Sequence, residues 1–263
     1  MFKILFFGDV VGAPGRKGLR AVLPDLRAEY APDLVIANVE NLSHGQGVSA
    51  KSLKELDDIG VDAYTSGNHV WGNQAGLSCF TDPAWKGRLI RPANVQPHLA
   101  GTGSMVIEKN GQRLLVINLL GTLFMKDQVE NPFLCFDSLI ADAPKMVLVD
   151  FHTETTSEKE ALGHYADGRA SAVLGSHTHV PTADTKILPG GTAFQTDVGR
   201  CGAHDSVVGY EKNSATKAFF PPFKRMYDLQ KSGTVEVNAV CVSIDPETGK
   251  ALALDRIRKI VDT

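Results

Sequence analysis

Short apolar runs alternate with amphipathic stretches through the first two thirds of the chain. The runs are short enough for buried strands, and they cover residues 3–8, 33–38, 61–65, 145–150 and 171–175. Helical spacing of apolar residues, as at Leu19, Leu23 and Leu26, predicts helices over residues 16–30, 49–59, 132–141 and 157–167. This alternation of strands and helices is typical of an α/β fold.

The remaining segments are predicted to be mostly β. Asn110-Gly111 separates two apolar stretches, residues 103–108 and 113–119, and suits the positive φ angles of a tight hairpin turn. Further strands are predicted in the last third, over residues 186–188, 192–195, 234–244 and 252–261. We therefore expect two packed mixed β-sheets flanked by helices, forming a single domain over residues 1–263.

Composition and charge narrow the class of protein. Apolar residues make up 43% of the chain and charged residues 22%, with a formal net charge of −3. These values indicate a globular protein with no general attraction to nucleic acid or to anionic membranes. No apolar run approaches the roughly 20 residues that cross a bilayer. The four cysteines are scattered without metal-site or disulfide spacing, which favours reduced thiols and a cytoplasmic location.

Polar side chains follow the apolar runs at the points where strands are expected to end. These side chains are Asp9, Glu40-Asn41, Asn68-His69, His152, His177 and His179. In open α/β sheets, functional groups gather at the carboxyl ends of the strands. An asparagine in such a position is ordinarily a turn residue, but histidine and glutamate are not turn formers. The recurrence therefore predicts a functional site.

The residue types in this set predict metal binding. Carboxylates, amide oxygens and imidazoles without a thiolate suit Mn²⁺, Fe or Zn²⁺ better than Mg²⁺ or Ca²⁺. The set exceeds what one catalytic ion needs, so we expect two divalent ions. In an extended segment, His177 and His179 lie on one side about 6.5–7 Å apart, and can reach different ions of a pair about 3.5–4 Å apart. We expect Glu40 to bridge the two ions.

The order of these motifs resembles the signature of the calcineurin-like metallophosphoesterases. The matching segments are Gly8-Asp9, Asn38-Val39-Glu40-Asn41, Gly67-Asn68-His69, His152 and residues 175–179 (GSHTH). Two departures identify a subgroup, because Asp9-Val10-Val11 lacks the usual histidine and Glu40-Asn41 replaces the usual bridging aspartate. With GDVVGAPGR at residues 8–16 and DVGRCGAHDSVVG at 197–209, the chain is similar to the YmdB-like bacterial phosphodiesterases.

The resemblance implies a four-layer sandwich and a specific assignment of the ligands. One ion would be held by Asp9, Glu40, Asn41 and His179, with Asn41 in place of the missing histidine. The other would be held by Glu40, Asn68, His152 and His177. His69 would be the general acid rather than a ligand. The ions expected are Fe or Mn, with Zn possible.

The implied reaction is metal-dependent hydrolysis of phosphate diesters, with 2′,3′-cyclic nucleotides as the expected substrates. A hydroxide activated between the two ions would attack phosphorus, and His69 would protonate the leaving oxygen. A phosphomonoesterase or nucleotidase on the same site is an alternative, and so is a regulatory nucleotide-binding protein with little turnover. Cys-x5-Arg phosphatase and Walker-type ATPase motifs are absent from the sequence.

Several residues near the motifs keep open roles at this stage. Arg16, His44, Arg200 and Asp205 lie in or beside glycine-rich segments that contact substrate in many enzymes. His204-Asp205 resembles the dipeptide of helical phosphohydrolases, but its glycine-rich surroundings predict a loop. The apolar pair Phe219-Phe220 gives a weak indication of homo-oligomerisation.

Overall fold

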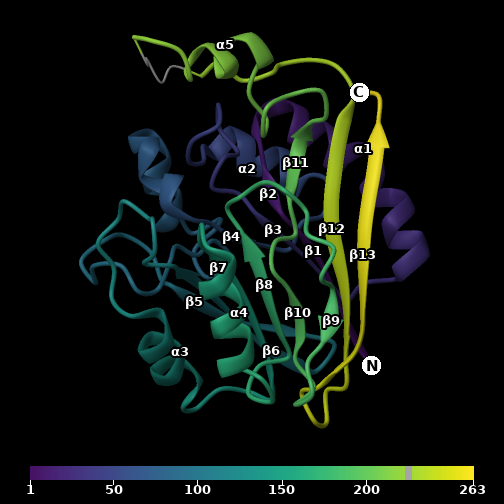
Figure 1. Cartoon of the computed structure of the whole chain (residues 1–263). Coiled ribbons are helices and arrows are strands. Elements are labelled where there is room, and N and C mark those ends of the chain that lie inside the picture. Colours follow the sequence, from purple (N-terminus) through teal and green to yellow (C-terminus); the bar gives the residue numbers. More distant parts are fainter. Residues whose placement is uncertain (223–226) are drawn as a thin grey trace.

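The computed structural model describes residues 1–222 and 227–263, which form two mixed β-sheets (Figure 1). The order in the first sheet is β2 (Asp9–Val10), β11 (Arg200–Ala203), β12 (Val235–Ile244), β1 (Phe2–Phe7), β3 (Leu34–Asn38) and β4 (Ala63–Thr65), with β13 (Ala251–Val261) also paired to β12. The order in the second is β5 (Ser104–Lys109), β6 (Gln112–Leu120), β7 (Met146–His152), β8 (Ala172–Ser176), β10 (Ala193–Gln195) and β9 (Lys186–Ile187).

Helices cover the outer face of each sheet. They are α1 (Gly12–Tyr30) and α2 (Ala50–Asp57) on the first sheet, and α3 (Pro132–Ile140) and α4 (Thr156–Tyr165) on the second. Shorter elements are η1 (Asn68–Gly72), η2 (Gln74–Phe80) and α5 (Lys212–Lys217), the last projecting at the upper end of Figure 1. Within the described ranges, no helix has both the length and the apolarity needed to span a membrane.

Three apolar clusters lie between the layers. The first packs α1 and α2 on one sheet and includes Leu23 and Val237. The second lies between the two sheets and includes Phe6 and Leu148, and the third packs α3 and α4 on the second sheet around Phe136. This confirms the predicted four-layer sandwich. The cluster shared by both sheets supports a single domain over residues 1–263, which stays a prediction.

Parallel pairing places several strand ends together. β1 pairs with β3 and β3 with β4, while β6, β7, β8 and β10 pair in sequence, all in parallel. These central strands are buried on both faces, which explains their almost continuous apolar runs. Their carboxyl ends meet at one edge of the sandwich, where polar side chains can converge.

The structure corrects two predicted boundaries. Helix α1 begins at Gly12 rather than at Arg16, because its glycines serve close packing and do not form a loop. A Cβ atom on Gly15 would lie 2.4 Å from the carbonyl oxygen of Cys201, and one on Gly18 would lie 2.5 Å from Val235. Strand β7 continues to His152 instead of ending at residue 150, because its ladder with β8 extends to Ser176.

Other elements escaped the sequence pattern. The glycine-rich segment 197–209 contains β11, which pairs with β2 and β12 far along the chain. The short helices η1, η2 and α5 were also missed, since they are too short to show an amphipathic period. The Asn110-Gly111 turn is confirmed, with positive φ angles of 52° and 74° between β5 and β6.

A buried carboxylate on β12 links stability to pH. Burial would raise the pKa of Glu236, but hydrogen bonds from Arg258, His204 and Asn238 outweigh it and lower the pKa from 4.5 to about 2. The resulting stabilisation is complete above about pH 4.5 and is lost as the pH falls toward 2. We expect Glu236→Gln to flatten this acid limb in urea unfolding measured from pH 6 to pH 2. An unchanged limb would contradict the assignment.

Candidate metal centre

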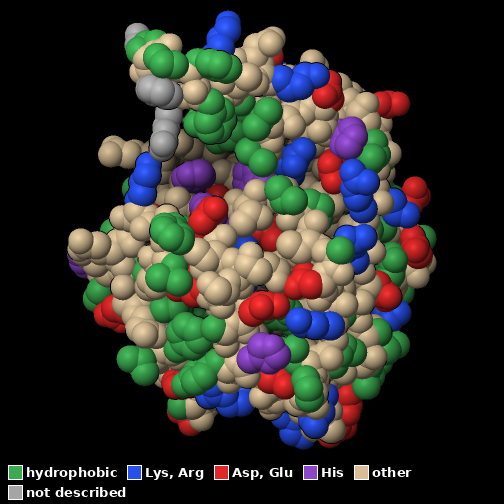
Figure 2. Space-filling view, viewed as in Figure 1, with side chains coloured by type: hydrophobic (Ala, Val, Ile, Leu, Met, Phe, Trp, Pro, Cys, Tyr) green, Lys and Arg blue, Asp and Glu red, His purple; other side chains and the backbone are tan. Residues whose placement is uncertain are grey.

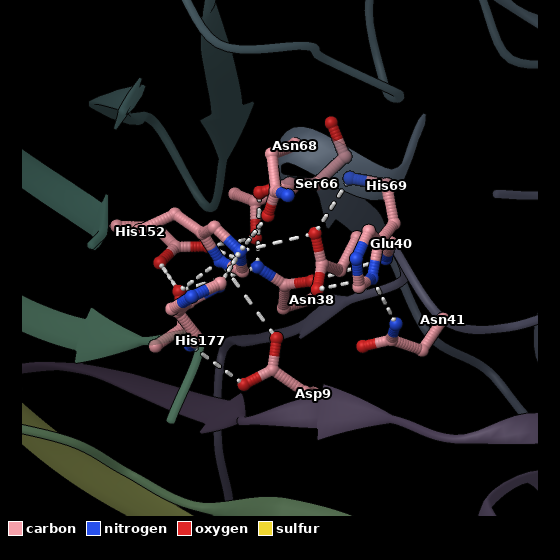
Figure 3. A network of polar contacts seen from close by, with 12 residues as sticks. Asp9, Asn38, Glu40, Asn41, Ser66, Asn68, His69, His152 and His177 are labelled. Carbon is pink, nitrogen blue, oxygen red and sulfur yellow. Dashed lines mark hydrogen bonds and ion pairs between the residues drawn. The ribbon is translucent and has the colours of Figure 1, made fainter. Parts of the chain in front are cut away.

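The predicted site residues converge where the strands of both sheets end (Figure 3). Asp9 lies on β2, Glu40 and Asn41 follow β3, and Asn68 and His69 open η1 after β4. From the second sheet come His152, the last residue of β7, and the segment containing His177 and His179, which follows β8. Figure 2 shows histidine side chains gathered in a hollow of the surface, below the end that carries α5.

One group of ligand-type atoms surrounds His152. Its Nε2 lies 3.0 Å from Glu40 Oε2 and 3.0 Å from His177 Nδ1. The same nitrogen lies 3.1 Å from Asn68 Oδ1. Glu40, His152 and His177 each offer an atom within 4.8 Å of the others. This group matches the set predicted for one of the two ions.

A second group shares Glu40 with the first. Asp9, Glu40 and His179 are all buried and offer atoms within 4.8 Å of one another. His179 Nε2 lies 3.0 Å from Asn41 Oδ1, which brings the asparagine amide oxygen to the same place. Glu40 is therefore the only residue of the described ranges that belongs to both groups, as a bridging ligand would.

Unpaired buried oxygens show that these residues suit cations. Within the described ranges, Asp9 Oδ1 and Glu40 Oε1 are buried without a hydrogen-bond partner. A buried carboxylate oxygen without a partner is strongly unfavourable unless a cation lies beside it. The mixture of imidazole and oxygen donors in the two groups fits divalent metal ions.

Burial and the charges of neighbouring groups together set the ionisation of the centre. Burial raises the pKa of Asp9 well above its usual value. Burial would also lower the pKa of His152, but the charge and hydrogen bond of Glu40 outweigh it and raise that pKa to about 9. Burial and the neighbouring His152 lower the pKa of His177 to about 3. In metal-free protein, the proton on His152 therefore offsets the negative charge of Glu40. Bound divalent ions would offset this negative charge instead.

The segment after β8 is not extended as predicted, and it holds its two histidines in strained backbone. His177 and His179 have φ angles of 97° and 66°, which residues with a Cβ rarely adopt. Asp197 restrains the residue between them by accepting hydrogen bonds from the backbone N–H and the hydroxyl of Thr178, at 3.0 and 2.8 Å. Buried Lys159 donates to the same carboxylate at 2.7 Å.

His69 lies beside the two groups and outside both. Its side chain is 34% exposed, and its backbone N–H donates to Glu40 Oε2 at 3.0 Å. Its Nδ1 lies 2.9 Å from Asn41 Nδ2, and the amide N–H is the donor of that pair. Nδ1 is therefore an acceptor, and in the neutral ring the proton lies on Nε2.

Four residues with open roles are now placed. Arg200 is buried and donates to the backbone oxygen of His179 at 3.2 Å, so it supports the strained segment. Arg16 pairs with Glu55 at 2.6 Å. Asp205 is exposed, follows β11 in a turn as predicted and pairs with Lys212 at 2.6 Å. His44 is exposed and lines, with Arg16, a cavity of about 410 Å³ outside the two groups.

Three residues that contact the predicted ligands directly or through another side chain were not identified from the sequence. Glu154 Oε2 lies 3.2 Å from His177 Nε2. Ser176 and Asp150 form a buried chain behind His152, which is described below. Asp150 and Ser176 stand directly at predicted strand ends, so the strand-end signal pointed to them as well. Only their geometry separates them from the ligands.

Comparison with known proteins identifies relatives over almost the whole chain. The model of the family described as YmdB-like protein matches residues 5–257. A Bacillus subtilis protein named 2′,3′-cyclic-nucleotide 2′-phosphodiesterase is 42% identical, over 97% of this chain and 96% of its own. The crystal structure of a phosphatase from Mycoplasma pneumoniae is 37% identical, with a TM-score of 0.92 over 99% of this chain and 94% of its own.

A more distant structure shows the breadth of the fold. A crystal structure described as that of a putative 5′-nucleotidase from Staphylococcus aureus is 14% identical, with a TM-score of 0.62. The match covers 99% of this chain and 54% of the nucleotidase. This likeness establishes shared architecture alone. Given the family match over nearly its whole length and the full-length relatives, the chain belongs to the YmdB-like protein family.

Proposed function

We propose that this protein is a metal-dependent phosphodiesterase that hydrolyses phosphate diesters, with 2′,3′-cyclic nucleotides as the substrate class. The observation that carries the proposal is the pair of ligand groups sharing Glu40, with His69 beside them. The Bacillus subtilis relative, 42% identical over nearly its full length, is named for this activity. A mere nucleotide-binding protein would have no use for a proton donor at this position.

Each residue of the centre has a role in the proposed reaction. Asp9, Glu40, Asn41 and His179 would hold one divalent ion, and Glu40, Asn68, His152 and His177 the other. When bound, the ions supply Lewis-acid activation of water and of the phosphoryl group. No nucleophilic side chain is then required. Asn41 orients His69 so that the proton on its Nε2 can pass to the leaving oxygen.

The role of His69 predicts a dependence on the leaving group. A nucleoside alkoxide is a poor leaving group and needs a proton, whereas p-nitrophenolate leaves readily without one. We expect His69→Ala to lower kcat for 2′,3′-cyclic AMP by about 10²–10⁴-fold. For bis-p-nitrophenyl phosphate the loss should be less than about tenfold. Steady-state kinetics with both substrates measure the difference.

His164 offers a matched control, because it is an exposed histidine at the end of α4. His164→Ala should leave both rates unchanged. Equal losses on the two substrates in His69→Ala would show that His69 supports binding or structure instead of donating a proton.

Hydrolysis of the monoester decides between the two enzyme classes. The Mycoplasma pneumoniae relative is described as a phosphatase, which keeps the monoesterase or nucleotidase as the second candidate. Wild-type protein with Mn²⁺, and with a chelator, should be assayed on 2′,3′-cyclic AMP, bis-p-nitrophenyl phosphate and p-nitrophenyl phosphate. Chelator-sensitive preference for the diesters supports the proposal, and preference for the monoester supports the alternative. No turnover of any substrate would favour a binding protein.

We also propose the finer properties of the protein. Iron or manganese is the expected native metal, with zinc as a further option, and elemental analysis of freshly purified protein tests this. The four free cysteines support a cytoplasmic location. Phe219 and Phe220 are 74% and 63% exposed, which supports homo-oligomerisation, testable by light scattering.

A further inference from the structure

We propose that Asp150, acting through Ser176, is a positioning residue that selects the tautomer of His152 and so presents its Nε2 to a divalent cation. The inference rests on the proposed function only in taking the centre to bind metal. All three residues are fully buried. Asp150 and Ser176 are not among the predicted ligands, and their contribution lies in the direction of two hydrogen bonds.

The first step fixes the partners of one oxygen of Asp150. The backbone N–H of Glu40 donates to Asn38 Oδ1 at 3.0 Å, so the other amide atom of Asn38 must be Nδ2. That Nδ2 donates to Asp150 Oδ2 at 2.8 Å, and the hydroxyl of Thr65 donates to the same oxygen. Asp150 Oδ2 therefore serves only as an acceptor.

The second step follows the single proton of Ser176. The serine Oγ lies 2.6 Å from Asp150 Oδ1 and 2.9 Å from His152 Nδ1. In its ionised form Asp150 can only accept, and the hydroxyl then donates to it. The serine oxygen must then accept from His152, which places the imidazole proton on Nδ1.

The third step concerns the opposite nitrogen of the ring. With its proton on Nδ1, neutral His152 has a lone pair on Nε2. That lone pair faces Glu40 Oε2 at 3.0 Å, Asn68 Oδ1 at 3.1 Å and His177 Nδ1 at 3.0 Å. Glu40 Oε2 and Asn68 Oδ1 can only accept, so in metal-free protein a second proton on His152 Nε2 faces them, and a bound divalent cation would replace that proton. The hydrogen bonds from Asn38 through Asp150 and Ser176 thus fix the ring of His152 so that Nε2, and not Nδ1, is presented to the metal.

The network makes Asp150→Asn a sharp test. Asn38 and Thr65 both donate to the position of Oδ2, so the new amide must place its oxygen there and its NH₂ toward Ser176. Ser176 would then accept from this NH₂ and donate to His152 Nδ1, which forces the proton onto Nε2. We expect the dissociation constant for Mn²⁺ to rise about 10–100-fold, although the side chain keeps its shape.

Nitrogen-15 NMR reads the tautomer directly. In histidine-labelled, zinc-loaded wild-type protein, His152 should show a proton on Nδ1 and metal on Nε2. In Asp150→Asn this pattern should be lost. Ser176→Ala removes the acceptor for Nδ1 and should also weaken Mn²⁺ binding. It provides the answer if Asp150→Asn does not fold, as checked by circular dichroism.

Ser171→Ala is the matched control, because Ser171 is buried directly before β8, the strand that ends at Ser176. Among the described residues its hydroxyl has one hydrogen bond, accepted from the Val147 N–H at 3.1 Å. Its Mn²⁺ affinity should equal that of wild type. Folded Asp150→Asn and Ser176→Ala proteins that bind Mn²⁺ within twofold of wild type would overturn the inference. Because these readouts need no turnover, a wild type that binds metal but hydrolyses nothing would refute the proposed function and leave this inference standing.

Discussion

Glu40→Gln is expected to lower kcat/KM for a phosphate diester by about 10³-fold or more and to reduce bound metal from two ions to at most one. Glu40 is the carboxylate common to both ligand groups, and glutamine keeps its shape while removing its charge. Metal ions stabilise transition-state charge by several kcal/mol. Each 1.36 kcal/mol corresponds to a factor of ten in rate. Kinetics and elemental analysis of the same preparation measure both effects.

Glu236→Gln is the matched control for this change. Glu236 is also a buried glutamate with several polar partners, but it lies on β12 outside both ligand groups. At neutral pH this variant should keep two ions and wild-type kcat/KM. If Glu40→Gln retained two ions and most of its activity, the shared-ligand arrangement would have to be abandoned.

Lys159→Met is expected to lower the free energy of unfolding of the metal-free protein by about 3–5 kcal/mol. The Lys159 ammonium and the Asp197 carboxylate are each only 1% exposed and lie 2.7 Å apart. Removal of one member of a buried ion pair leaves the other charge without compensation. Lys159 also donates to the backbone oxygen of Ser176 at 2.8 Å, so the strained histidine segment should loosen too. Urea unfolding with chelator present measures the loss.

Lys54→Met makes the same change in a surface ion pair. Lys54 and Asp58 are 72% and 52% exposed and lie 3.2 Å apart, one helical turn from each other. Exposed pairs of this kind contribute about 0–1 kcal/mol. A loss below about 1 kcal/mol in Lys159→Met as well would mean that the buried pair contributes little net stability.

The local pattern of the sequence was sufficient for most of the architecture. Runs such as residues 33–38 and 145–150 have strand length and are apolar throughout, because parallel strands are buried on both faces. The turn at Asn110-Gly111 could also be predicted, because asparagine and glycine are the residues that most readily adopt the positive φ angles of a tight hairpin turn.

Predictions failed where a residue's role depends on a distant partner. Gly15 was placed before the predicted helix, yet it lies inside α1, where its missing Cβ lets the backbone of Cys201 approach closely. Arg200 was placed in a glycine-rich loop with an open role, but it is buried on β11 and donates to the backbone oxygen of His179. Packing across such long sequence separations leaves no local period.

By itself, the sequence determined the strands and the polar residues at their ends, since both follow from local patterns of side-chain type. The sequence and its family resemblance also predicted that Glu40 is shared and that His69 is not a ligand. Only the tertiary structure provided the distances that bring Glu40 into both groups, and the buried chain from Asp150 through Ser176 to His152. The physical reason is the separation along the sequence over which each effect acts. Hydrophobic periodicity acts over a few residues, whereas these roles depend on atoms about 3 Å apart that come from strands of two different sheets.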